Sequence, residues 1–188
     1  MSSNKFTIES RFVFLVDLLL KNGWGASAIK KVEDAYAFAS LAHSGQKRYS
    51  GEPFIIHPVE VAILLTEVKP DPDTVSAGLL HDIIEDTDTK FEDLEKRFGI
   101  EVAKLVDGVT KVTTQQKQFD VVNSDIRKLE AIRKPLLESI YDPRIIIIKL
   151  ADRLHNLRTI KYLPEDSQKK NARETLNIYS PIAHQLGL

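Results

Sequence analysis

Residues 79–87, LLHDIIEDT, place one imidazole and three carboxylates within a short apolar run. Charged side chains rarely interrupt such a run without a partner, because burying an unpaired charge costs folding free energy. We therefore expect the cluster to be exposed to solvent, paired with basic groups or bound to a cation. For an acidic patch considered alone, a solvated polar surface is the ordinary outcome.

Two residues elsewhere in the chain favour the cation. His57 directly precedes Pro58, which is typical of the first turn of a helix. Asp152 lies in the strongly apolar run IIIIKLADRLHNL, where a lone carboxylate needs a partner. Both side chains could approach the acidic run, but only tertiary structure can bring them there.

The residue types indicate which ion such a site would bind. Imidazole and carboxylate groups without sulfur suit Mn²⁺ or Fe²⁺ better than a closed structural zinc site. Glu85 and Asp86 follow the His-Asp pair by one helical turn, where they could orient a water molecule or accept its proton. The candidate ligands are His57, His81, Asp82 and Asp152.

Helical periodicity dominates the chain, so we expect an all-α fold in which separate helices carry these residues. Residues 113–123 are polar, lack a clear period and are expected to form a mobile loop that could include a short β-hairpin. In the first half of the chain we expect helices at 6–21 and 27–43, one that begins near Pro58, and one that begins at Asp73 or Thr74 and carries the His81–Asp82 pair. Two more helices should follow, separated by Gly99. The last three are one after Ser124 with a kink at Pro135, a long buried one from Pro143, and one from Pro164 to about Leu186.

Length and composition predict one soluble, cytoplasmic domain spanning residues 1–188. The net charge of −1 gives no electrostatic footprint for nucleic acid or a membrane surface, and the chain has no cysteine. The apolar run FVFLVDLLL is too short for a membrane span and lacks the basic region of a signal peptide. These features leave the oligomeric state open, with a monomer favoured.

Five ordered blocks make the sequence similar to a known family. HSGQKRYSGEPFIIHP, GLLHDIIEDTDT, VDGVTK, IIIIKLADRLHNLRT and RETLNIYSPIAHQLGL resemble the hydrolase domain of the RelA/SpoT-homologue enzymes, a branch of the HD superfamily of phosphohydrolases. The resemblance covers about residues 30–188. The His-Asp pair alone would be a weak signal, whereas five blocks in order are specific.

The resemblance implies an all-α HD-type bundle and Mn²⁺-dependent removal of the 3′-pyrophosphate from guanosine tetra- or pentaphosphate. It matches His57, His81, Asp82 and Asp152 to metal ligands, and Glu85 and Asp86 to the pair that positions the attacking water. The positions matched to nucleoside contacts are Arg48, Tyr49, Ser50, Asn156, Thr159 and Tyr179.

Several alternatives remain open. The same metal chemistry could act on another nucleotide, such as the 2′-phosphate of NADPH, or the chain could be an inactive nucleotide sensor, although its ligand set is complete. Relatives with a second, synthetase domain continue beyond the last block, so the chain is either a small stand-alone hydrolase, which we favour, or one domain of a bifunctional enzyme. Ala131 also departs from the family pattern, in which an Asn is frequent.

Other polar residues in the matched blocks have simpler interpretations. His43 and His184 are expected to be polar or capping histidines and not ligands, and His155 is expected to point away from Asp152. Lys149 and Arg153 fit two roles equally well: neutralising substrate phosphates, or extending from a buried helix to solvent.

Overall fold

The structure is a computed structural model that describes residues 8–120 and 142–188, and over these residues the chain is helical. The one extended pairing found there is an isolated antiparallel bridge between Lys47 and Pro53. The predicted all-α class is therefore confirmed. The helices are α1 (Ile8–Lys21), α2 (Ala26–Ala42), α3 (Ile56–Leu65), α4 (Pro72–Leu80), α5 (Ile83–Asp86), α6 (Phe91–Phe98), α7 (Ile100–Asp120), α9 (Pro143–Arg158), α10 (Glu165–Glu174) and α11 (Ser180–Gln185), with short turns η1 (Thr66–Val68), η2 (Ile160–Tyr162) and η3 (Thr175–Tyr179).

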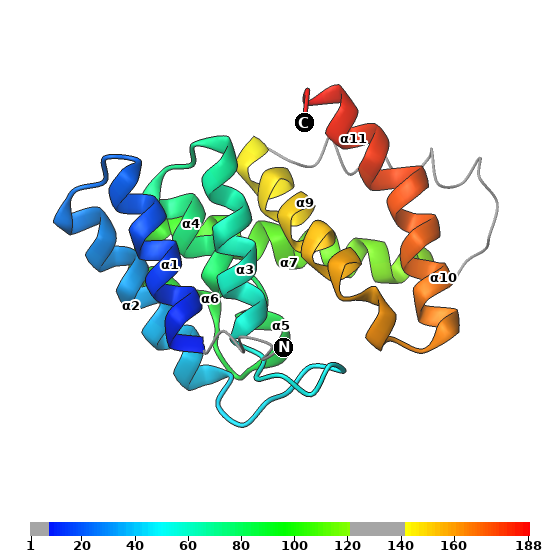
Figure 1. Ribbon diagram of the computed structural model, residues 1–188, viewed down its shortest axis with the longest axis horizontal. Helices are drawn as coiled ribbons and strands as arrows, with labels where there is room; N and C mark the ends of the chain where they lie inside the picture. The colour runs from blue at the N-terminus through cyan, green and yellow to red at the C-terminus, as the bar shows by residue number, and fades with distance from the viewer. Residues whose placement is uncertain (1–7, 121–141) are drawn as a thin grey trace, which may run out of the picture.

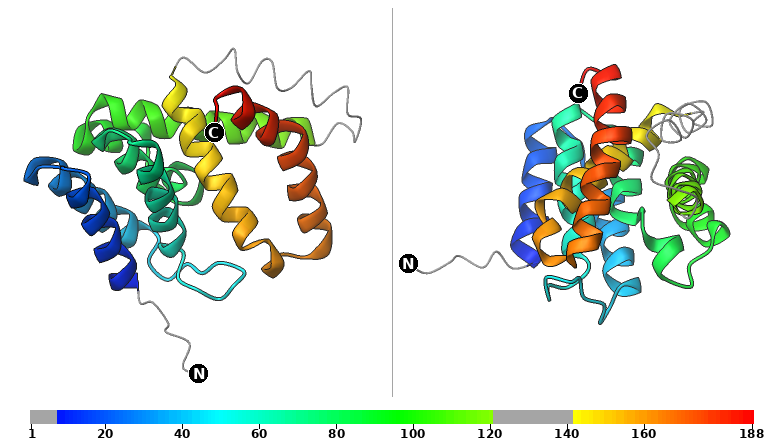
Figure 2. Two further views of the ribbon diagram at one scale, coloured as in Figure 1. Left: turned by 45° about the horizontal axis from the view of Figure 1, so that its top comes forward. Right: turned by 90° about the vertical axis from the view of Figure 1, so that its right-hand side faces the viewer.

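Helices α3 and α4 form the centre of the bundle. They lie between the α1–α2 pair and α9, and α7 crosses behind them in the view of Figure 1. Figure 2 shows α10 and α11 beyond α9, at the opposite end from α1 and α2. Nearly every residue of α3 and α4 is buried, because both helices are covered on more than one side. None of the helices in the described ranges combines the length and apolar character needed to cross a membrane.

Side-chain caps fix the starts of two helices that lead to the predicted site. The backbone N–H of Thr74 donates to the Asp71 carboxylate (2.8 Å), so α4 starts at Pro72, slightly earlier than predicted. The N–H of Arg144 donates to the Asp142 carboxylate (2.9 Å), and α9 starts at Pro143 as predicted. Each cap satisfies an N–H that lacks a partner in the first turn, and each proline occupies a position where no N–H is needed.

Three predicted elements differ from the structure. The helix expected to carry the His-Asp pair ends at Leu80, and α5 starts only at Ile83, so the pair lies at a break between two helices. The predicted loop or hairpin over residues 113–123 is wrong for residues 113–120, which continue α7. The last predicted helix contains a π-helical turn at Thr175–Tyr179. Residues 121–123, the predicted helix after Ser124 with its kink at Pro135, and Ala131 lie outside the described residues.

Packing between α7 and α9 depends on a glycine. A Cβ added at Gly108 would lie 3.0 Å from Ile145 Cγ1 and closer still to its Cδ1, inside normal contact distance. We expect Gly108→Ala to lower the free energy of unfolding by about 1 kcal/mol, because overpacking costs about 1–3 kcal/mol and exceeds the roughly 1 kcal/mol gained in helix propensity. Denaturant unfolding measures the change. In the Ile145→Val background the same substitution should become neutral or stabilising; an equal loss in both backgrounds would contradict this packing.

Candidate metal centre

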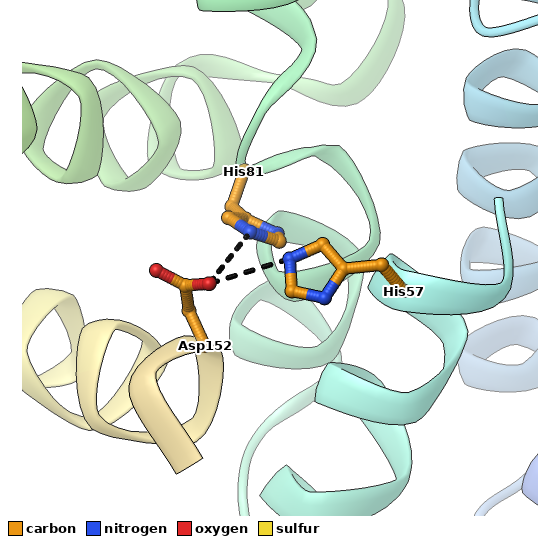
Figure 3. Close-up of side chains that lie close together, drawn as sticks. All are labelled: His57, His81 and Asp152. Atoms are coloured by element: carbon orange, nitrogen blue, oxygen red, sulfur yellow. Dashed lines mark ion pairs between the residues drawn. The ribbon is translucent and has the colours of Figure 1, made fainter. Parts of the chain in front are cut away.

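Three helical segments bring two imidazoles and a carboxylate together. His57 lies in the first turn of α3, His81 directly follows α4, and Asp152 lies in the middle of α9. One donor atom from each lies within 4.8 Å of the others, and all three residues are buried. Figure 3 shows their side chains pointing toward one another. Their convergence meets the first requirement for a metal site.

Asp82 lies against the same imidazoles but faces them with different oxygens. Its Oδ2 is 3.4 Å from His57 Nε2, and its Oδ1 is 3.2 Å from His81 Nε2. Asp152 instead turns one oxygen to both rings, with Oδ1 at 3.3 Å from His57 Nε2 and 3.8 Å from His81 Nε2. The side chain of Asp82 is partly exposed and that of Asp152 is buried, so Asp82 forms the wall nearer to solvent.

The imidazole of His81 has the hydrogen-bonding pattern of a metal ligand. Its Nδ1–H donates to the carbonyl oxygen of Gly78 (2.8 Å), which leaves Nε2 as the nitrogen that faces the carboxylates. Nε2 is buried and makes no hydrogen bond that satisfies normal geometry. Buried polar atoms are rarely left unsatisfied, and a histidine that binds metal typically donates its other N–H to a carbonyl or carboxylate. The residues present therefore fit a divalent ion.

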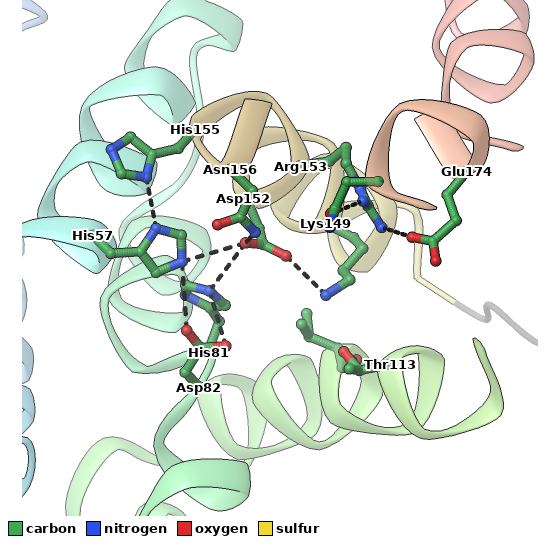
Figure 4. Close-up of polar contacts among 12 residues, drawn as sticks. His57, His81, Asp82, Thr113, Lys149, Asp152, Arg153, His155, Asn156 and Glu174 are labelled. Carbon is green, nitrogen blue, oxygen red and sulfur yellow. Dashed lines mark hydrogen bonds and ion pairs between the residues drawn. The ribbon is translucent and has the colours of Figure 1, made fainter. Parts of the chain in front are cut away.

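A buried lysine and an asparagine hold the Asp152 carboxylate. Lys149 Nζ donates to Oδ2 (2.8 Å), and Asn156 Nδ2 donates to Oδ1 (2.5 Å), as Figure 4 shows. Burial by itself raises the pKa of Asp152, but Lys149 and the two imidazoles lower it well below its ordinary value. Burial likewise lowers the pKa of Lys149, and Asp152 more than offsets this effect. The carboxylate is therefore ionised, and its charge is available to a cation.

His155 occupies a position that sequence reasoning missed. It was expected to point away from Asp152, yet its Nδ1 lies 2.7 Å from His57 Nδ1 and the residue is buried. Burial, followed by the nearby His57 and Arg48, lowers the pKa of His155 to about 3, so this imidazole is neutral. The sequence did contain a signal for this position: His155 follows Asp152 by three residues, and residues three apart lie on the same face of a helix.

The metal-site residues open into a cavity of about 420 Å³. The cavity brings together most of the residues predicted to act on a substrate, from the loop after α2, from α5 and from α9. Lys149 also reaches it, while His81 lies behind its wall. The predicted residues that line it are Arg48, Tyr49, Ser50, His57, Asp82, Glu85, Asp86, Asp152, Asn156 and Thr159.

Two hydrogen bonds hold the loop after α2 over this cavity. Arg48 Nη2 donates to Asn156 Oδ1 (2.6 Å), and Gln46 Nε2 donates to the carbonyl oxygen of Asp86 (3.0 Å). Burial lowers the pKa of Arg48, while Asp82 and Asp152 partly offset that effect, and the guanidinium stays charged. The loop is thus connected both to the metal-site helix α9 and to the acidic segment.

Three other polar residues lie outside this cavity. Tyr179 lines a neighbouring cavity instead, where the Arg153 guanidinium carbon lies 4.4 Å from its ring centroid. Arg153 forms a buried ion pair with Glu174 (2.7 Å) and does not line this cavity, so neither predicted role, neutralising substrate phosphates or extending to solvent, describes it. His43 is the C-cap residue of α2, in agreement with the predicted capping role, and its ring stacks on Phe54.

The chain belongs to the HD domain family, whose model matches residues 35–188. Its relatives include the bifunctional (p)ppGpp synthase/hydrolase SpoT of Escherichia coli, 48% identical over 160 residues, and a guanosine-3′,5′-bis(diphosphate) 3′-pyrophosphohydrolase of Aquifex aeolicus, 45% identical over 159 residues. Each alignment covers 85% of this chain and 22% of the relative, so the chain spans about a fifth of the length of these proteins. The resemblance predicted from the sequence is confirmed.

One solved structure is similar over nearly its whole length. It belongs to a metazoan orthologue of SpoT described as hydrolysing ppGpp and acting in starvation responses. The TM-score is 0.59 with 25% sequence identity, and the match covers 84% of this chain and 96% of that one. The helical arrangement described above therefore corresponds to that of a known nucleotide hydrolase.

Removal of the Asp152 charge tests the metal centre. We expect Asp152→Asn to weaken Mn²⁺ binding at least tenfold, because the ion loses a charged ligand while the buried Lys149 cation keeps its charge. Calorimetric titration measures the affinity, and His43→Asn is a matched control in which another buried polar residue changes. Equal Mn²⁺ affinity in the wild type and in Asp152→Asn would exclude the site as described.

Metal binding should also release a proton. Burial alone would lower the pKa of His81, but Asp82 and Asp152 raise it to about 10. At neutral pH a proton therefore occupies Nε2 of His81, the nitrogen that would bind the ion. Because Mn²⁺ must displace this proton, its apparent affinity should rise about tenfold per pH unit for each proton displaced. Titrations between about pH 6 and 8, in buffers with different ionisation enthalpies, report the number released. If neither the Mn²⁺ affinity changes with pH nor the binding enthalpy changes with the buffer, metal binding does not release a proton.

Proposed function

We propose that this chain is a Mn²⁺-dependent hydrolase that removes the 3′-pyrophosphate of guanosine tetra- or pentaphosphate, giving GDP or GTP and pyrophosphate. One observation carries the proposal: a buried His57–His81–Asp152 group opens into a cavity that also contains an acidic pair and an arginine. The activities named for the relatives and for the metazoan orthologue support the same substrate class.

In the proposed reaction a water oxygen attacks the phosphorus atom bonded to the 3′ oxygen. The new P–O bond forms as the bond to the 3′ oxygen breaks, one proton leaves the water, and one proton reaches the 3′ oxygen. His57, His81 and Asp152, with Asp82 as a fourth ligand, would hold the ion. A divalent ion there supplies positive charge that neutralises phosphoryl oxygens and makes water more acidic.

In this proposal Glu85 and Asp86 would accept the proton of the attacking water. Both line the cavity next to Asp82, on the short helix α5, and neither belongs to the group of closest donor atoms. A carboxylate at this position can accept a proton as the phosphorus–oxygen bond forms. The hydrogen bond from Gln46 to the Asp86 backbone connects this segment to the loop after α2.

The side of the cavity formed by the loop after α2 suits a purine nucleoside. The Arg48 guanidinium can stack on a base and meet phosphate oxygens, and Tyr49 presents a largely exposed ring beside it. Asn156 connects this side to the metal site, because it bonds to both Arg48 and Asp152. Thr159 lies one turn further along the helix and also faces the cavity.

Turnover of guanosine tetraphosphate with added Mn²⁺ tests the proposal, with the products separated by ion-exchange chromatography. Equal amounts of GDP and pyrophosphate are expected, and a chelator should abolish the reaction. The same assay with NADPH tests the alternative substrate, since an arginine can also stack on adenine. Absence of turnover for guanosine tetraphosphate in the presence of bound Mn²⁺ would overturn the proposal.

Substitution of the acidic pair should separate chemistry from binding. We expect Glu85→Gln and Asp86→Asn to lower kcat about 10²–10⁴-fold, because general acid–base assistance typically contributes that much. Mn²⁺ affinity and binding of guanosine tetraphosphate should change little, since neither needs the proton transfer. Steady-state kinetics and calorimetry measure both quantities. Wild-type turnover by either variant with Mn²⁺ bound would remove that carboxylate from the mechanism.

Substitution on the nucleoside side should have the opposite effect. Arg48→Ala is expected to raise KM while kcat falls much less, because a contact made equally in the ground state and the transition state affects only binding. Arg48→Lys is the matched variant: it keeps the charge but cannot stack as a planar group. If Arg48→Ala lowers kcat without raising KM, Arg48 acts in the chemical step instead.

A further inference from the structure

The contact between His57 and His155 joins the same nitrogen of two buried rings. The two Nδ1 atoms lie 2.7 Å apart, and the ring centroids lie 4.9 Å apart at a tilted angle. The other nitrogen of His57, Nε2, faces Asp152 at 3.3 Å and Asp82 at 3.4 Å. Figure 4 shows His57 between His155 on one side and the carboxylates on the other.

A hydrogen bond between two Nδ1 atoms requires one donor and one acceptor. A neutral imidazole carries a single N–H, so a proton on Nδ1 leaves Nε2 unprotonated, and a proton on Nε2 leaves Nδ1 unprotonated. If His57 donates from Nδ1, its Nε2 has a free lone pair directed at the metal site. If His155 donates instead, Nε2 of neutral His57 carries the proton and cannot bind a metal ion.

We propose that His155 is a positioning residue that accepts a hydrogen bond from His57 Nδ1–H and thereby selects the metal-binding tautomer of His57. This inference rests on the metal site of the proposed function and adds a residue to it. Metal-ligating histidines usually donate to a carboxylate, a carbonyl oxygen or water, and His81 follows that pattern with Gly78. For His57 the acceptor is a second imidazole.

The position of His155 in the fold supports this role. It lies on α9 three residues after Asp152, so one rigid helix carries both a ligand and the acceptor for another ligand. Both rings are buried, which keeps water from replacing the acceptor. A shift of α9 would therefore move the Asp152 carboxylate and the His57 orientation together.

Two substitutions at position 155 separate hydrogen bonding from packing. His155→Leu fills the site without an acceptor and should weaken Mn²⁺ binding about 10–100-fold, the usual effect of losing such a partner. His155→Asn places an amide oxygen near the former Nδ1 and should stay within about threefold of the wild type. Calorimetry gives the affinities, and melting with a chelator present checks that both variants fold. Wild-type affinity in His155→Leu, or an equal loss in both variants, would overturn the inference.

The proton position can also be read directly in the wild-type protein. Zn²⁺ is a diamagnetic probe for the site, and ¹⁵N shifts of labelled histidines distinguish the two tautomers. With Zn²⁺ added, His155 should carry its proton on Nε2 and His57 on Nδ1. A proton on Nδ1 of His155 would overturn the inference even if His155→Leu fails to fold.

These measurements remain independent of the proposed activity. If the wild type does not hydrolyse guanosine tetraphosphate but His155→Leu loses Mn²⁺ affinity and His155→Asn keeps it, the hydrogen bond stands and the substrate assignment fails. If the wild type is active and His155→Leu binds Mn²⁺ normally, the substrate assignment stands and the role of His155 fails.

Discussion

The arrangement of this protein depends on one buried carboxylate. Asp152 is buried in an apolar helix, where an isolated charge would be strongly unfavourable. Lys149 neutralises one of its oxygens, while the other oxygen faces two imidazoles and an amide. Lys149 belongs to α9 itself, whereas the two imidazoles come from α3 and from the residue after α4, so the contacts of Asp152 link these three elements.

The helix boundaries place the ligands where they can reach Asp152. His57 comes within the first turn of α3 and His81 directly after the end of α4, where side chains can leave the helix surface and meet the middle of α9. On α9 the Arg153–Glu174 pair extends the polar contacts to α10. Gly108 lets α7 approach α9 closely at Ile145, so α7 forms part of the cavity wall.

Charge separates the cavity into two regions. Carboxylates gather beside His57 and Lys149 on the metal side, whereas the loop after α2 presents the Arg48 cation and the ring of Tyr49. Asn156 bridges them, since its oxygen accepts from Arg48 and its N–H donates to Asp152. In the proposed function, Arg48 and Tyr49 would contact the base, while a bound divalent ion and Lys149 would supply the positive charge that the phosphates need. In the proposed function, Asn156 on α9 would therefore link nucleoside binding to the position of the reacting phosphorus.

The sequence by itself determined the helical class, the main helix starts and the residue types of the metal centre, because periodicity, capping residues and ligand chemistry are local properties. The resemblance of whole blocks also predicted nucleoside contacts for Arg48 and Asn156, and both residues line the cavity. Tertiary structure alone decided that His57, His81 and Asp152 meet, that Arg153 pairs with Glu174, and that His155 contacts His57. These contacts join residues far apart in the chain, and their geometry depends on helix packing that no local pattern specifies. The continuation of α7 through residues 113–120 was missed because its polar sequence lacks the apolar period by which helices are recognised.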